Sequence, residues 1–127
     1  MGVFESFFRN EAERAKPEKI VISERFKDKN GKAEEWEIRA INAAFDRGLR
    51  MAEPKDSESY LARLCTACVV YPNLNDAALQ SSYGVMGAER LLREMLMPGE
   101  YAYLIKCVRR INGFDRDFGE LIKEAKN

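Results

Sequence analysis

Residues 19–41 read KIVISERFKDKNGKAEEWEIRAI, and this stretch decides the fold class. Apolar residues lie at even-numbered steps on either side of Lys29-Asn30-Gly31: Ile20, Ile22 and Phe26 before it, and Trp36, Ile38 and Ala40 after it. A period of two is typical of half-buried strands, and Asn-Gly between two such runs is typical of a hairpin turn. The stretch therefore predicts one antiparallel β-hairpin.

The length of the hairpin loop fixes which residues of the two strands face each other. A two-residue Asn30-Gly31 loop leaves the apolar residues of the strands on opposite faces. A three-residue loop, Lys29 to Gly31 with Gly31 in the left-handed region, pairs Ile22 with Ile38 and Ile20 with Ala40, which gives the hairpin one apolar face. We predict the three-residue loop. Because a lone hairpin is only marginally stable in water, helices must cover that apolar face.

The N-terminal residues 1–17 show the spacing of an amphipathic helix. Phe4, Phe7 and Phe8 begin a stripe of three- and four-residue steps that continues to residue 15, and Pro17 ends it. We predict a helix over residues 3–15. Its apolar face would dock on the core of the same chain, on a second copy or on a client protein, and the sequence does not choose between them.

After the hairpin, the apolar period becomes that of helices. Residues 42–56 predict a short helix and a mobile connection, because Gly48 weakens the helix and Pro54 interrupts it. From residue 57 onward, prolines and glycines divide the chain into a cluster of short helices. The first expected helix is capped by Ser57 and continues through Val69 until Pro72 stops it. The others are 77–83 capped by Asp76, 87–97, 101–111 and 114–126.

Length and composition place the chain among ordinary globular proteins. Its 127 residues suit one domain, and 46% hydrophobic with 33% charged residues is the usual balance of a folded chain. We predict a single domain over residues 1–127, of the α+β class and mostly α. In it, an N-terminal helix (1–17) and one antiparallel β-hairpin (19–41) pack on a cluster of short helices (57–127), with 42–56 as the connection.

The charge balance limits the classes of partner that the chain could bind. Lys plus Arg and Asp plus Glu both number 21, so the formal net charge is zero, and the charges are interspersed. This pattern disfavours nucleic acid as the main partner. No apolar run approaches the roughly 20 residues of a membrane span, and the first residues lack the features of a secretory signal. We therefore expect a cytoplasmic protein that binds neither nucleic acid nor membrane.

Residue types associated with catalysis are sparse. The chain has no histidine, which removes the commonest general base and the usual catalytic zinc ligand sets. Cys65 and Cys68 have Cys-x-x-Cys spacing but lie in an expected apolar helix, where cysteine behaves as a small hydrophobe. Residues 84–87, GVMG, contain too few glycines for a phosphate-binding loop. We predict no enzyme activity, no cofactor, and no catalytic, cofactor-binding or metal-ligating residue.

Seven short sequence blocks follow one another from the hairpin to the C-terminal part of the chain. They are IVISERFKD (20–28), WEIRAI (36–41), YLARL (60–64), VVYPNL (69–74), SYGVMGAE (82–89), LMPGEY (96–101) and INGF (111–114). In these blocks, and in their spacing, the chain resembles the XkdN-like tail-assembly chaperones of phages and defective prophages of Gram-positive bacteria. It departs from that pattern in residues 42–56, where family members often carry a longer insert.

The resemblance implies a non-enzymatic role in the host cell. Such a chaperone would bind the tape-measure protein, keep it soluble during tail assembly, and be absent from the mature virion. Other tail proteins are possible partners, as is a second copy of the chain. The resemblance carries over no binding residues. Because thioether and aromatic side chains adapt to varied apolar surfaces, we expect client contacts from Met86, Met95, Met97, Tyr101 and Tyr103, for which ordinary core packing is the alternative.

Two other functions are compatible with the sequence. Short helices around residues 84–87 could form a helix-turn-helix in a small DNA-binding regulator, with Arg90, Arg93, Arg109 and Arg110 contacting phosphates. Zero net charge and the glutamates among these arginines weaken that reading. The second alternative is a minor structural component of the tail.

Overall fold

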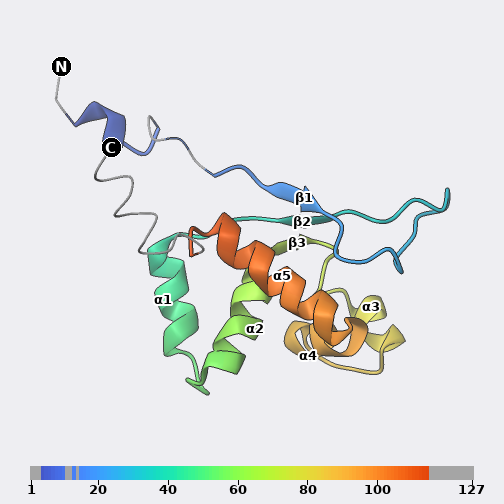
Figure 1. The fold of residues 1–127 in the computed structure, drawn as a ribbon. Coiled ribbons are helices and arrows are strands. Elements are labelled where there is room, and N and C mark those ends of the chain that lie inside the picture. Colours follow the sequence, from blue (N-terminus) through green and yellow to red (C-terminus); the bar gives the residue numbers. More distant parts are fainter. Residues whose placement is uncertain (1–3, 11–12, 14, 115–127) are drawn as a thin grey trace.

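The computed structural model describes residues 4–10, 13 and 15–114 of the chain. In these ranges, α-helices pack beneath a small antiparallel sheet (Figure 1). The elements, in chain order, are η1 (Glu5–Phe7), β1 (Glu18–Ile20), β2 (Trp36–Ile38), α1 (Ala43–Met51), α2 (Ser57–Cys68), β3 (Val69–Tyr71), α3 (Ala77–Ser82), α4 (Ala88–Met95) and α5 (Pro98–Ile111). The predicted class, α+β and mostly α, is confirmed. The helix predicted over residues 114–126 lies almost wholly outside the described residues.

The sheet has a third strand that the sequence analysis assigned to the end of a helix. Its order is β1-β2-β3, and β3 pairs antiparallel with β2 through Ile38 and Val69. Two β-branched valines followed by a residue that precedes Pro72 favour extended backbone, so α2 ends at Cys68. The backbone N–H of Arg39 then donates to the Cys68 carbonyl at 2.8 Å, which joins the end of α2 to the sheet.

The hairpin loop is the predicted one, but the strand register is not. Gly31 has a φ of 79°, and the Asp28 N–H donates to the Lys32 carbonyl at 2.8 Å, which closes the three-residue loop. Farther from the loop, Ile20 faces Trp36 instead of Ala40, and Ile38 faces Glu18 instead of Ile22. The reason is that residues 21–26 leave the first strand, so that Ile22 enters the core.

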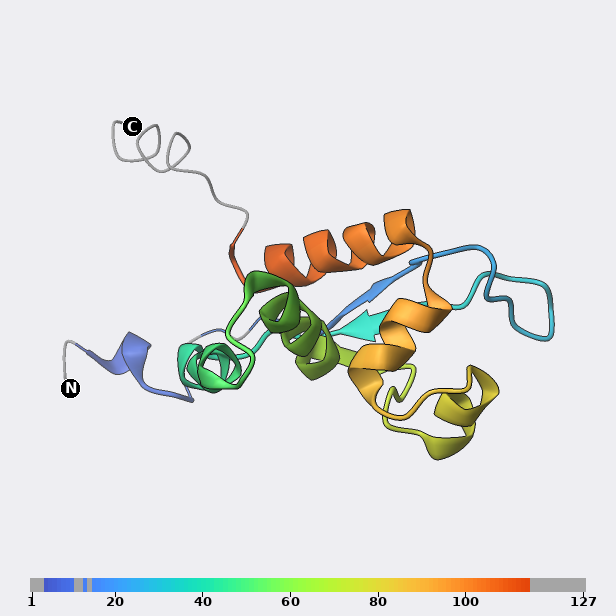
Figure 2. The same ribbon diagram turned by 90° about the horizontal axis from the view of Figure 1, so that it is seen from below.

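The core lies between the sheet and the helices. Trp36 and Ile38 of β2 point inward, where α2 lies under the sheet and contacts α1, α4 and α5 (Figure 2). Leu91, Leu92 and Met95 of α4 are buried. The cysteines Cys65, Cys68 and Cys107 are buried free thiols, which confirms the packing role predicted for Cys65 and Cys68. Burial raises the pKa of Cys65 to about 12, so this thiol stays protonated at neutral pH.

The helix predicted over residues 3–15 is, among the described residues, only the 3-10 helix η1. Phe4, Phe7 and Phe8 are exposed, and η1 stands apart from the helical body in both ribbon views (Figures 1 and 2). A short helix needs tertiary packing to offset the free-energy cost of nucleation. In the described structure these phenylalanines have no core surface to pack against, so their periodicity alone does not produce a long helix.

A buried arginine holds the connection between α1 and α2, which the sequence analysis expected to be mobile. Arg63 of α2 is 9% exposed. Its guanidinium donates to the carbonyls of Leu49 at 2.8 Å, Ala52 at 3.2 Å and Pro54 at 3.1 Å. The cap of α2 is Asp56 rather than Ser57, because the Asp56 carboxylate accepts the Ser59 N–H at 2.7 Å.

No helix in the described ranges is long and apolar enough to cross a membrane.

Candidate functional site

An apolar hollow opens between the hairpin and α3. Four aromatic side chains line it, together with Pro72, Leu79, Met95 and Glu34, and its volume is about 180 Å³. Phe26 comes from the segment that leaves the first strand, Trp36 from β2, Tyr71 from the end of β3, and Tyr83 from the end of α3. Trp36 is 2% exposed and Tyr71 is 52% exposed. Trp36 therefore forms the floor of this aromatic hollow, and Tyr71 forms its rim.

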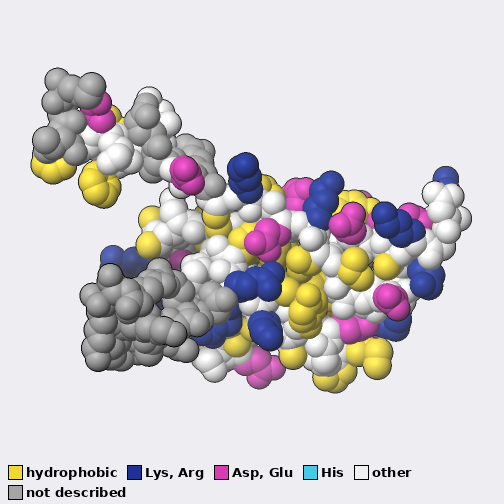
Figure 3. All heavy atoms as spheres, turned by 45° about the horizontal axis from the view of Figure 1, so that its top comes forward, with side chains coloured by type: hydrophobic (Ala, Val, Ile, Leu, Met, Phe, Trp, Pro, Cys, Tyr) yellow, Lys and Arg dark blue, Asp and Glu magenta, His cyan; other side chains and the backbone are white. Residues whose placement is uncertain are grey.

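A second hollow adjoins the first on the side of the sheet that the helices leave uncovered. It has a volume of about 540 Å³ and shares Glu34 and Tyr71 with the aromatic hollow, so the two are adjacent. We call it the charged groove. Its other lining residues are Lys19, Asp28, Lys32, Ala33, Glu35, Glu37 and Val70. Apolar side chains lie among charged ones of both signs on this side of the molecule (Figure 3).

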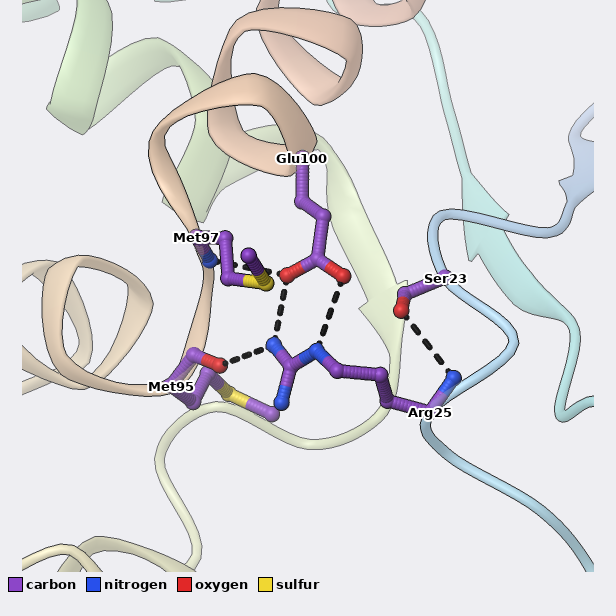
Figure 4. Close-up of polar contacts among 5 residues, drawn as sticks. All are labelled: Ser23, Arg25, Met95, Met97 and Glu100. Atoms are coloured by element: carbon purple, nitrogen blue, oxygen red, sulfur yellow. Dashed lines mark hydrogen bonds and ion pairs between the residues drawn. The ribbon is translucent and has the colours of Figure 1, made fainter.

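An ion pair holds the wall of the aromatic hollow that carries Phe26. The Arg25 guanidinium donates to both carboxylate oxygens of Glu100, at 3.0 and 2.5 Å, and to the Met95 carbonyl at 3.0 Å (Figure 4). It also lies 4.9 Å from the centre of the Phe26 ring. Glu100, in the first turn of α5, accepts the Met97 N–H at 2.8 Å. These contacts fasten residues 21–26 to the junction of α4 and α5.

The Arg25–Glu100 ion pair should make the melting temperature of the protein depend on pH. Hydrogen bonds from Arg25, Ser23 and the Met97 backbone lower the pKa of Glu100 from 4.5 to about 2. A depressed pKa stabilises the fold above the unfolded value and loses that effect as pH falls through the folded value. We expect the wild type to have a higher Tm than Glu100→Gln above about pH 5, and this difference to shrink between pH 4.5 and 2. Differential scanning calorimetry of both proteins checks this, and a pH-independent difference would contradict it.

The five residues expected to contact a client lie in different places. Met95, 6% exposed, is the one that lines the aromatic hollow. Met97 is exposed beside the Arg25–Glu100 pair, and Met86, 84% exposed, lies between α3 and α4. Tyr101 is half-buried, and burial raises its pKa to about 12, whereas Tyr103 is exposed. The two tyrosines lie about 200° apart around α5, so the five residues do not form one surface. Their contact with a client stays a prediction.

The aromatic hollow itself was not found from the sequence. Its four aromatic residues are 10, 35 and 12 positions apart in order along the chain, so no local spacing connects them. One signal was available. Phe26, Trp36, Tyr71 and Tyr83 each fall in one of the short blocks on which the family resemblance depends.

The arginines considered for DNA binding do not form a uniformly basic face. Arg110 pairs with Glu18 at 3.3 Å, and the Arg109 guanidinium lies 5.5 Å from the centre of the Phe114 ring. Arg90 and Arg93 share α4 with Glu89 and Glu94. Phosphate recognition needs an unopposed basic surface, and these four side chains do not provide one.

Comparison with known proteins identifies the class to which this fold belongs. The model of the phage XkdN-like tail assembly chaperone family matches residues 4–126, and the chain belongs to this family. It is 28% identical over 123 residues to the phage-like element PBSX protein XkdN of Bacillus subtilis strain 168, covering 86% of this chain and 83% of that protein. It is 30% identical over 122 residues to the uncharacterized protein YqbN of the same strain, covering 85% and 82%.

A solved structure supports the fold. The crystal structure of the protein YqbN superposes on this chain with a TM-score of 0.83 and 26% sequence identity. The match covers 91% of this chain and 99% of the other. The family resemblance inferred from the seven sequence blocks is therefore confirmed.

Proposed function

We propose that this chain binds the tape-measure protein of its phage or prophage in the host cytoplasm and keeps it soluble while the tail assembles. The aromatic hollow carries the proposal, because it offers an apolar site with one aromatic wall at the surface. A tape-measure protein is a long, largely helical chain, so a chaperone would cover apolar faces of its helices. Amphipathic helices are commonly recognised through apolar anchor side chains that enter an apolar site on the partner.

Exposed apolar side chains outside the hollow would give the client further contacts at other places on the surface. Met86, Met97 and Tyr103 are exposed in the described structure. Thioether side chains adapt to many apolar surfaces, which suits a chaperone whose client presents a series of different segments. In this proposal the chain acts without catalysis, exchanges bound segments as assembly proceeds, and is left out of the finished particle.

Co-expression with the tape-measure protein tests the proposal. We expect the tape-measure protein to move from the insoluble to the soluble fraction and to elute with this chain in size-exclusion chromatography. Co-expression with an unrelated soluble protein of similar size is the control. The proposal fails if the chain neither co-elutes with the tape-measure protein nor raises its solubility. Mass spectrometry of purified particles separates a chaperone, which is absent, from a structural tail component, which is present.

A further inference from the structure

The dimensions of the aromatic hollow suit one side chain and not a whole helix. Its volume of about 180 Å³ lies below the roughly 300–1,000 Å³ of pockets that hold small molecules. The Phe26 and Trp36 rings are 6.3 Å apart, centre to centre, and tilted by 49°. Phe26, Leu79 and Met95 form apolar walls around the buried Trp36 floor. A leucine, methionine or phenylalanine side chain that projects from a client is the kind of group that fits.

The charges next to the hollow indicate which kind of residue should neighbour that apolar side chain in the client segment. The charged groove has four carboxylates and two ammonium groups among its lining side chains. Asp28 is already engaged by the N–H groups of Asn30 and Lys32, and Lys19 lies opposite Glu37 in the sheet register. Glu34 and Glu35 form no ion pair with any residue that the structure describes. Their negative charge is therefore available to a partner.

We infer that the aromatic hollow and the charged groove together bind a client segment that places one large apolar side chain in the hollow and a neighbouring Lys or Arg against Glu34 and Glu35. Glu34 lines both hollows, so the two contacts are adjacent. This inference rests on the proposed function, since it names the tape-measure segments that the chaperone would select. Charge complementarity would act mainly on the choice of segment and the rate of association.

Trp36 provides the measurement, because it is the one tryptophan of the chain and lies at the floor of the hollow. Overlapping fragments of the tape-measure protein that lack tryptophan are titrated into the full-length chain while its emission is followed. We expect saturable changes with fragments that have an apolar residue close to Lys or Arg. We expect Glu34→Lys to weaken binding of those fragments at least ten-fold, and added salt to weaken wild-type binding more than Glu34→Lys binding.

A matched variant controls for general electrostatics. Glu94→Lys makes the same charge change on an exposed residue of α4 that lines neither hollow. Its binding should stay within two-fold of wild type. Glu34→Lys should keep the wild-type fold, because the hairpin uses only the Glu34 backbone N–H, which donates to the Phe26 carbonyl at 2.7 Å. Exchanging the client lysine for glutamate should restore binding to Glu34→Lys.

Four outcomes overturn the inference. If fragments bind without changing Trp36 emission, or if Glu34→Lys and Glu94→Lys weaken binding equally, the hollow is not the client site even though the proposed function stands. If the protein self-associates without client, and removal of the exposed Phe7 side chain then changes the Trp36 emission, a second copy of the chain and not the client occupies the hollow. If the wild type binds no part of the tape-measure protein, the co-expression test fails as well and both conclusions fall.

Discussion

Replacing Arg63 with methionine should lower the free energy of unfolding by about 2 to 3 kcal/mol. The Arg63 guanidinium is the shared donor for the carbonyls of Leu49, Ala52 and Pro54. Methionine fills a similar volume with apolar atoms but leaves these carbonyls without their charged donor. Hydrogen bonds to charged groups contribute more than neutral ones, and losing them also frees the connection between α1 and α2.

Urea denaturation at equilibrium measures this change, with Arg47→Met as the control. Arg47 is exposed on α1, so its replacement should change the free energy of unfolding by less than about 0.5 kcal/mol. Arg63→Lys should fall between wild type and Arg63→Met, because lysine keeps the charge but not the planar fork that reaches separate carbonyls. A loss below about 1 kcal/mol in Arg63→Met would show that other contacts hold the connection.

Replacing Trp36 with alanine should lower the free energy of unfolding by about 3 to 5 kcal/mol. Trp36 is nearly fully buried in the core and packs against Phe26. Truncation removes its buried apolar area and leaves a void where the sheet, the hairpin segment and α4 meet. The effect should appear as a lower midpoint of urea denaturation, followed by far-UV circular dichroism because the substitution removes the tryptophan signal.

Tyr71→Ala separates the core role of Trp36 from a role at the surface. Tyr71 lines the same hollow but is about half exposed, so its truncation should cost less than about 1 kcal/mol. Equal destabilisation by the two substitutions would mean that the rim of the hollow is as tightly packed as its floor. That result would argue against an open site at this position.

Local interactions explain the features that the sequence predicted well. The Asn-Gly pair fixed the three-residue hairpin loop with Gly31 at positive φ. The Asp76 carboxylate caps α3 by accepting the Leu79 N–H at 2.8 Å, and Gly84 follows the end of that helix with a φ of 68°. Each feature depends on residues within a few positions of one another, so a pattern in the sequence is enough to show it.

The features that were missed depend on distant contacts. The strand register changes where residues 21–26 leave β1, and Arg25 anchors that segment to Glu100, 75 positions away. Strand β3 has only three residues, too few for a period of two to be distinguished from the last turn of α2. The aromatic hollow draws its walls from separate elements, so it exists only once the tertiary fold has formed.

The uncovered sheet also bears on the solubility of the protein itself. Its outer strands, β1 and β3, are each three residues long, and β1 carries the charged side chains Glu18 and Lys19. Long, flat, apolar sheet edges recruit strands from other chains, whereas short edges with charged side chains resist such pairing. The described sheet therefore presents little edge backbone on which a misfolded strand can grow.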